Sequence, residues 1–210
     1  MECMLLNVSV LTSSGYGISE ACAHAGANVA MVYHNHPDVE KVAEDLAKAT
    51  GRTIKPYKCD VSNAEVVLET VKKISQEMGE ITGLAANAGV SRVKPALEMT
   101  TDDFNFVFGV NVLGVFNTCR AVAQHWVDTG FKKGSIVVTS SMSSEIYNQK
   151  FLNEPLTQVF YNSSKGAATS MVKGLAAEWA KYGIRVNALE PGFCDTEQTS
   201  GMDPKIREWQ

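Results

Sequence analysis

The chain alternates between short apolar runs and longer amphipathic stretches. Residues 28–33 (NVAMVY) and 81–86 (ITGLAA) carry apolar side chains at nearly every position. Runs of this kind are typical of strands that are buried on both faces of a parallel sheet. Four further runs have the same character, and the sequence therefore predicts six strands, over residues 5–12, 28–33, 53–61, 81–86, 134–140 and 184–189.

The stretches between these strands repeat their apolar residues at helical spacing. Within residues 38–50, Val39, Val42 and Leu46 fall on one face, and Gly51 follows as a C-terminal stop. Helices are predicted over residues 38–50, 64–78, 103–127 and 157–182, and a further helix begins after the first strand. Strands that alternate with helices form βαβ units, so the predicted fold class is α/β, a Rossmann-like doubly wound parallel sheet.

Composition and charge restrict the class of protein further. The 210 residues are 45% apolar and 20% charged, which suits one globular domain over residues 1–210 and excludes a disordered chain. With 19 basic and 23 acidic residues, the net charge of −4 gives no reason to expect nucleic acid or an anionic membrane as partner. We see no apolar run that approaches the ~18 residues of a membrane span, and Glu2 stands where a secretory signal carries positive charge.

The cysteines point to a reducing compartment. Five are scattered along the chain without a C-x-x-C pair: Cys3, Cys22, Cys59, Cys119 and Cys194. An odd, unpaired set argues against a disulfide framework and against a structural zinc site. We therefore predict a cytoplasmic protein without a bound metal.

Ligands in a doubly wound sheet bind beyond the carboxyl ends of the strands. The first predicted strand is followed by TSSGYGIS (Thr12 to Ser19), in which Gly15 and Gly17 would let the backbone approach a pyrophosphate at a helix start. The same residues also suit a plain turn. The third strand ends in Cys59-Asp60-Val61, where Asp60 either accepts a hydrogen bond from an adenine amino group or caps the next turn.

Two other strand ends carry small or turn-forming residues. Asn87-Ala88-Gly89 follows the fourth strand and would let a flat ring lie against the backbone, and Pro191-Gly192 follows the sixth, with Thr196 shortly after. Tyr161-x-x-x-Lys165 opens the last predicted helix, so both side chains lie on one face, one turn apart. A neighbouring ammonium stabilises a phenolate and lowers its pKa. Such pairs also occur by chance, but this one follows the hydroxyl-rich strand end Thr139-Ser140-Ser141.

Taken in order, these motifs resemble the short-chain dehydrogenase/reductases over essentially the whole chain. The matching pieces are the Gly-containing turn, Cys59-Asp60-Val61, Asn87-Ala88-Gly89, Asn111 in VNVLGVFN, the SSMSS segment, Tyr161-Asn-Ser-Ser-Lys165 and Pro191-Gly192. Within that family, SIVVTSSMSS and LTQVFYNSSK are similar to the NADP-dependent mannitol 2-dehydrogenases and to their neighbours that reduce sorbose or xylulose. The resemblance implies an oxidoreductase that interconverts a polyol and a ketose by hydride transfer.

The resemblance also implies roles for individual residues. Tyr161 would be the acid in ketose reduction and the base in polyol oxidation, Lys165 would lower its pKa and hold the ribose, and Ser141 would bind the substrate oxygen. Asn111 would support a water that relays protons to Lys165, unless it is a helix-internal amide satisfied by the backbone. The predicted cofactor-binding residues are Thr12, Ser14, Gly15, Gly17, Ile18, Tyr33, His34, Asp60, Val61, Asn87, Ala88, Gly89, Tyr161, Lys165, Pro191, Gly192 and Thr196.

The end of the second strand bears on the choice of cofactor. An NAD enzyme normally places an acidic residue at position 33, where this chain has Tyr33. NADP is therefore predicted, with a weakened 2′-phosphate site, because His34 and Tyr16 stand where NADP enzymes carry basic residues. His34 and His36 have no further ligands beside them in the sequence, and exposed loop histidines explain them better than a metal.

Two departures from the family pattern affect the prediction. Ser13 and Ser19 replace glycines of the turn, and we expect them to weaken NADP affinity. Family chains continue beyond Gln210 with a lid helix, another helix and a last strand that close the pocket and build a homotetramer. The chain is thus expected to be C-terminally incomplete, with strand 184–189 as an exposed edge and without the segments that build the tetramer.

Two alternatives to a polyol/ketose oxidoreductase stay open. One is a catalytically impaired nucleotide-binding sensor or scaffold, and the other is a reductase of oxoacyl or steroid ketones.

Overall fold

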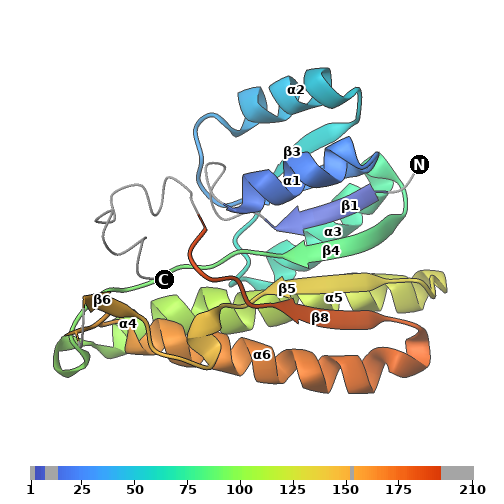
Figure 1. Cartoon of the computed structure of the whole chain (residues 1–210). Coiled ribbons are helices and arrows are strands. Elements are labelled where there is room, and N and C mark those ends of the chain that lie inside the picture. Colours follow the sequence, from blue (N-terminus) through green and yellow to red (C-terminus); the bar gives the residue numbers. More distant parts are fainter. Residues whose placement is uncertain (1–2, 8–13, 152–153, 195–210) are drawn as a thin grey trace.

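A six-stranded parallel sheet forms the centre of the protein (Figure 1). The computed structural model describes residues 3–7, 14–151 and 154–194. The strand order is β3-β2-β1-β4-β5-β8. The first three strands are added toward one edge and the later strands toward the other, so the switch point in strand order lies between β1 and β4. The strands are β1 Cys3–Asn7, β2 Asn28–Tyr33, β3 Ile54–Lys58, β4 Ile81–Ala86, β5 Ser135–Thr139 and β8 Arg185–Leu189. The predicted doubly wound fold is confirmed.

The predicted strands differ from the observed ones mainly at their ends. Strands 28–33 and 81–86 match their predicted bounds. The predicted strand 53–61 stops at Lys58, because Asp60 turns the chain by bonding to Ser62. Residues 8–12 of the first predicted strand lie outside the described residues. Within the described part of the chain β8 ends the sheet order, as expected for an edge strand.

Helices cover the sheet on two sides (Figure 1). The helices are α1 Ser14–His24, α2 Val39–Thr50, α3 Ala64–Met78, α4 Thr101–Phe108, α5 Val115–Thr129 and α6 Val159–Trp179. Helices α1 and α2 bury a small core that includes Met31 and Leu46. Helices α3, α5 and α6 bury a larger core on the other face, around Ile136 and Trp126. The Trp126 indole N–H donates to the Ile81 carbonyl, so even this fully buried polar group is satisfied.

The predicted continuous α-helix over residues 103–127 is wrong in its middle. Residues Gly109–Gly114 form a π-helical segment between α4 and α5. The π-helical segment is only six residues long, so it changes the apolar pattern too little for periodicity alone to reveal the break. π-Segments inside α-helices frequently mark functional sites, and this one contains Asn111.

The helical run Thr101–Thr129 is long and apolar enough, by length and composition, to cross a membrane. This corrects the expectation that no segment approaches that length: polar residues interrupt the apolar run, but the mean hydropathy of its most apolar 18-residue window is high. Of its most apolar 18-residue window, 56% is buried inside the protein, and α5 packs on α3 and β4. Asn117 within the run is buried and donates to the Val61 carbonyl. These are the features of a core helix.

A small hairpin that the sequence did not predict lies between β5 and α6. Strands β6 (Gln149–Phe151) and β7 (Glu154–Pro155) pair antiparallel. Its base is closed by a hydrogen bond from the Leu156 N–H to the main-chain carbonyl of Asn148. The chain then enters α6 at Val159, two residues later than predicted.

Candidate active site

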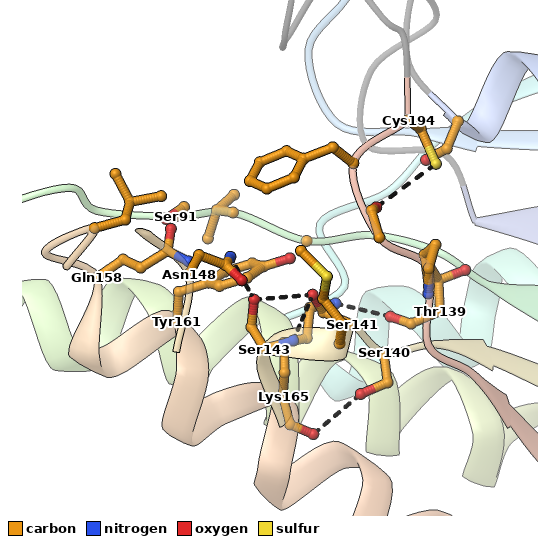
Figure 2. Close-up of a pocket in the computed structure, with 18 of the residues that line it drawn as sticks. Ser91, Thr139, Ser140, Ser141, Ser143, Asn148, Gln158, Tyr161, Lys165 and Cys194 are labelled. Carbon is orange, nitrogen blue, oxygen red and sulfur yellow. Dashed lines mark hydrogen bonds between the residues drawn. The ribbon is translucent and has the colours of Figure 1, made fainter. Parts of the chain in front are cut away.

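A cavity of about 380 Å³ lies over the carboxyl ends of β4, β5 and β8 (Figure 2). It reaches Ser14, the first residue of α1. Its lining includes residues from four of the predicted motifs: Asn87 and Gly89, the Thr139–Ser141 strand end, the Tyr161–Lys165 pair, and Pro191-Gly192. Residues as far apart in the sequence as Ser14 and Cys194 therefore meet at one edge of the sheet.

Tyr161 and Ser141 face each other in this cavity. Tyr161 lies in the first turn of α6, and Ser141 caps the short helix Met142–Ser144 by accepting from the Ser143 N–H at 3.1 Å. Burial raises the pKa of the Tyr161 phenol, and the hydrogen bond with Ser141 opposes that shift. The phenol is consequently protonated at neutral pH.

Lys165 lies beside the Tyr161 ring, and its ammonium makes its hydrogen bond to a third residue. Its ammonium donates to the Thr139 carbonyl at 2.7 Å and lies 5.7 Å from the centre of the Tyr161 ring. The pKa of Tyr161 is raised overall, because burial outweighs the hydrogen bond with Ser141, and the lowering by Lys165 stays a prediction. Burial itself lowers the pKa of Lys165 to about 8, because only 3% of the residue is exposed and the charged form loses its hydration.

Asn111 is fully buried, and its amide is occupied by protein partners. The Oδ1 atom accepts from the Val90 N–H at 2.8 Å, while Nδ2 donates to the Val90 carbonyl and to Ser164 Oγ, both at 2.9 Å. This is the pattern expected of an amide satisfied by the backbone. A Cβ added at Gly89 would lie 3.5 Å from both Asn111 Oδ1 and Lys165 Nζ, so the three residues are neighbours. The water-relay role of Asn111 stays a prediction.

The helix start near the predicted pyrophosphate site is partly described. Ser14 Oγ donates to Asn87 Oδ1 at 3.4 Å, and a Cβ added at Gly17 would meet none of the described residues within 4 Å. Ser19 is fully buried, and its hydroxyl donates to the Gly15 carbonyl at 2.9 Å, so the extra polar group is satisfied within the helix. Ile18 packs on the smaller core. Thr12, Ser13 and Thr196 lie outside the described residues.

The predicted adenine end shows mainly structural contacts. Asp60 Oδ1 accepts from the Ser62 N–H at 2.9 Å and from its hydroxyl at 2.7 Å, and these bonds lower the pKa of Asp60. That geometry is the turn cap, and an adenine contact stays a prediction. Val61 and Ala88 belong to the larger core.

The residues that bear on the 2′-phosphate lie at the end of β2. Tyr33 is half-buried and His34 is exposed, whereas the Tyr16 hydroxyl donates to Glu20 at 3.2 Å. His36 is half-buried rather than fully exposed, and its Nδ1 accepts from the Asp38 N–H. Among the described residues, no group of three or more His, Cys, Asp and Glu side chains is placed to hold a metal ion.

Sequence reasoning missed the polar residues on the hairpin side of the cavity. Ser91, Ser143, Asn148 and Gln158 all line it, and Figure 2 shows them with Tyr161 and Ser141. One signal was present: the interval of 20 residues between Ser141 and Tyr161 is long for the family, and the β6–β7 hairpin occupies it.

The same architecture occurs in solved structures of oxidoreductases. A short-chain type dehydrogenase/reductase from Mycobacterium marinum matches with a TM-score of 0.87 and 32% sequence identity, over 95% of this chain and 75% of that one. An NADPH-dependent 3-quinuclidinone reductase from Rhodotorula rubra matches with a TM-score of 0.85 and 27% identity, over 99% and 74%. The class of protein is therefore a Rossmann-fold oxidoreductase.

Sequence relatives give the family. A family model described as enoyl-(acyl carrier protein) reductase matches residues 10–210. A sorbose reductase from Candida albicans is 34% identical over 200 residues, which are 93% of this chain and 68% of the relative. An NADP-dependent mannitol dehydrogenase from Alternaria alternata is 33% identical, over 88% and 67%. The chain belongs to the short-chain dehydrogenase/reductase family and is an oxidoreductase.

Proposed function

We propose that the protein is an NADP(H)-dependent oxidoreductase that interconverts a polyol and a ketose, with Tyr161 as acid and base. The observation that carries the proposal is the meeting of Tyr161, Ser141 and Lys165 in one cavity at the carboxyl ends of the strands. Relatives named as sorbose reductase and as NADP-dependent mannitol dehydrogenase support the substrate class and the cofactor.

The residues present fit a dinucleotide. The cavity runs from the first residue of α1, where helix N–H groups favour an anion, to the Tyr161–Lys165 pair. No described residue lies within 4 Å of a Cβ added at Gly17, so none of them crowds this position of the helix start. Position 33 carries no acidic group that would repel a 2′-phosphate. Bound NADPH supplies a hydride; Ser14, Asn87, Gly89, Lys165 and Gly192 line the cavity where its nicotinamide half would be held.

The chain's own groups handle the proton and the charge. In ketose reduction Tyr161 donates its phenolic proton to the carbonyl oxygen, while the Ser141 hydroxyl binds the same oxygen and stabilises its developing charge. The Lys165 ammonium, close to the ring, stabilises the phenolate that remains. Because burial raises the pKa of Tyr161, the acid role operates at neutral pH and the base role in polyol oxidation needs alkaline pH.

The test is NADPH oxidation with fructose, sorbose and xylulose, using the wild type and Tyr161→Phe. We expect the wild type to reduce at least one ketose and the variant to lose about 100-fold or more in kcat, the usual contribution of a general acid. NADH should serve less well than NADPH. If the wild type reduces none of the three ketoses faster than Tyr161→Phe does, acid catalysis by Tyr161 on these substrates is refuted.

We also infer the organisation that goes with this function: one domain, a cytoplasmic location, and a small polyol or ketose rather than nucleic acid as partner. The globular composition and acidic balance support these inferences.

A further inference from the structure

Asn148, at the base of the β6–β7 hairpin, carries a buried acceptor without a partner. The residue is only 5% exposed, and its Nδ2 donates to Ser143 Oγ at 2.8 Å. Its carbonyl oxygen Oδ1 has no hydrogen-bond partner among the described residues. An unpaired buried acceptor is unfavourable, so native proteins seldom retain one without a functional or solvent partner.

A second unpartnered oxygen borders the same cavity. Ser91 lies in the loop after β4, and its hydroxyl is the other buried side-chain polar atom that lacks a partner in the described part of the chain. Ser91 and Asn148 come from segments 57 positions apart in the sequence, yet both line the cavity that holds Tyr161 (Figure 2). Both orphan oxygens thus belong to one site, which points to a ligand that satisfies them.

The atoms left free define the chemistry of that ligand. The Asn148 oxygen only accepts, and the Ser91 hydroxyl both donates and accepts, so together they match alcohol groups. Asn148 is joined to the reacting centre through Ser143, whose Oγ also accepts from Ser141 Oγ at 3.1 Å. The recognised hydroxyl is therefore one close to the carbonyl carbon. The terminal torsion of Asn is soft, so a small rotation brings its oxygen onto the ligand.

We propose that Asn148 and Ser91 form a hydroxyl-binding subsite that selects polyhydroxylated substrates over apolar ketones of the same length. This inference rests on the proposed function and adds the residues that set its specificity. An analogue without the hydroxyl leaves the buried acceptor unpaired, and sites of this kind discriminate strongly against such analogues.

The kinetic test compares fructose with 2-hexanone, which share a carbonyl at C2 of a six-carbon chain. In Asn148→Leu we expect kcat/KM for fructose to fall about 10- to 100-fold while that for 2-hexanone is unchanged or higher; Ser91→Ala should shift the ratio in the same direction. Asn105→Leu, at an exposed position of α4, is the matched control and should change neither. An equal fall in kcat/KM for both ketones would show damage to Ser143 and Ser141. If kcat/KM changed for neither ketone, Asn148 would not recognise the substrate. Either result overturns the subsite.

A binding measurement separates this inference from the proposed function. Saturation-transfer NMR with NADP⁺ present detects fructose without ketose reduction, since the oxidised cofactor has no hydride to give to the carbonyl. The signal should be present in the wild type and absent in Asn148→Leu. Binding with that pattern but no NADPH oxidation would refute the proposed function and support the subsite. Absent binding in the wild type, or equal binding in the variant, would overturn the subsite itself.

Discussion

The buried ammonium of Lys165 imposes a cost on folding that alkaline pH removes. Burial lowers the pKa of this group from 10.5 to about 8, which corresponds to about 3 kcal/mol against the folded state. The folded-state pKa lies below the unfolded one, so between pH 8 and 10.5 the unfolded chain binds more protons. Stability attributable to Lys165 therefore rises with pH through that window, and the full cost is present below pH 8.

Lys165→Met removes the charge and keeps most of the side-chain volume. At pH 7 the substitution relieves about 3 kcal/mol of charge burial, but it also removes the donor of the Thr139 carbonyl, a loss of about 1 kcal/mol. We expect the variant to be more stable than the wild type at pH 7 by roughly 2 kcal/mol. That advantage should shrink by about 2–3 kcal/mol at pH 10, where the wild-type amine is largely neutral.

Urea unfolding of both proteins at pH 7 and pH 10 measures this difference. Other titrating groups, Tyr161 included, are common to both proteins and largely cancel. Lys173→Met, at an exposed position of the same helix, is the control and should show a small effect that does not change with pH. An equal difference at both pH values, or a variant that is destabilised at pH 7 and recovers at pH 10, would refute the argument. Lys165→Met should also lack ketose reduction, a trade of stability against activity.

Further predictions concern packing, thiols and pH. Gly183→Ala should destabilise the protein by about 3 kcal/mol or more, because φ is +74° and the new Cβ would lie 2.4 Å from a backbone oxygen. Gly174→Ala, in open space within α6, should stabilise it by about 0.5–1 kcal/mol; thermal melts that rank the two variants in the reverse order would contradict this. A thiol reagent should label exposed Cys194 in the folded protein but Cys119, buried with a pKa of about 12, only after unfolding; comparable folded-state rates would be inconsistent with the burial. Polyol oxidation should increase from pH 7 to pH 10 while ketose reduction is largely retained, because the raised pKa of Tyr161 keeps the phenol mostly protonated over that range, and a pH-independent oxidation rate would speak against Tyr161 as the base.

The strands were predictable because burial on both faces leaves a plain record in the sequence. Residues 28–33 and 81–86 lie in the interior of the sheet and are apolar throughout, and their bounds were predicted correctly. The end of β3 was not, because its last turn depends on hydrogen bonds of Asp60 rather than on apolar pattern. The π-segment around Asn111 escaped for a similar reason: it differs from an α-helix in hydrogen-bond register, which residue types do not record.

What the sequence determined by itself is the order of strands and helices, the family motifs and the placing of Tyr161 and Lys165 on one helical face. Spacing along one element is a local property, and a sequence records it directly. Tertiary structure alone decided that the Lys165 ammonium bonds to the Thr139 carbonyl, 26 residues away. It also brought Asn148 and Ser91 to the cavity. Such partners are chosen where distant chain segments converge and water is excluded, and no local pattern specifies that choice.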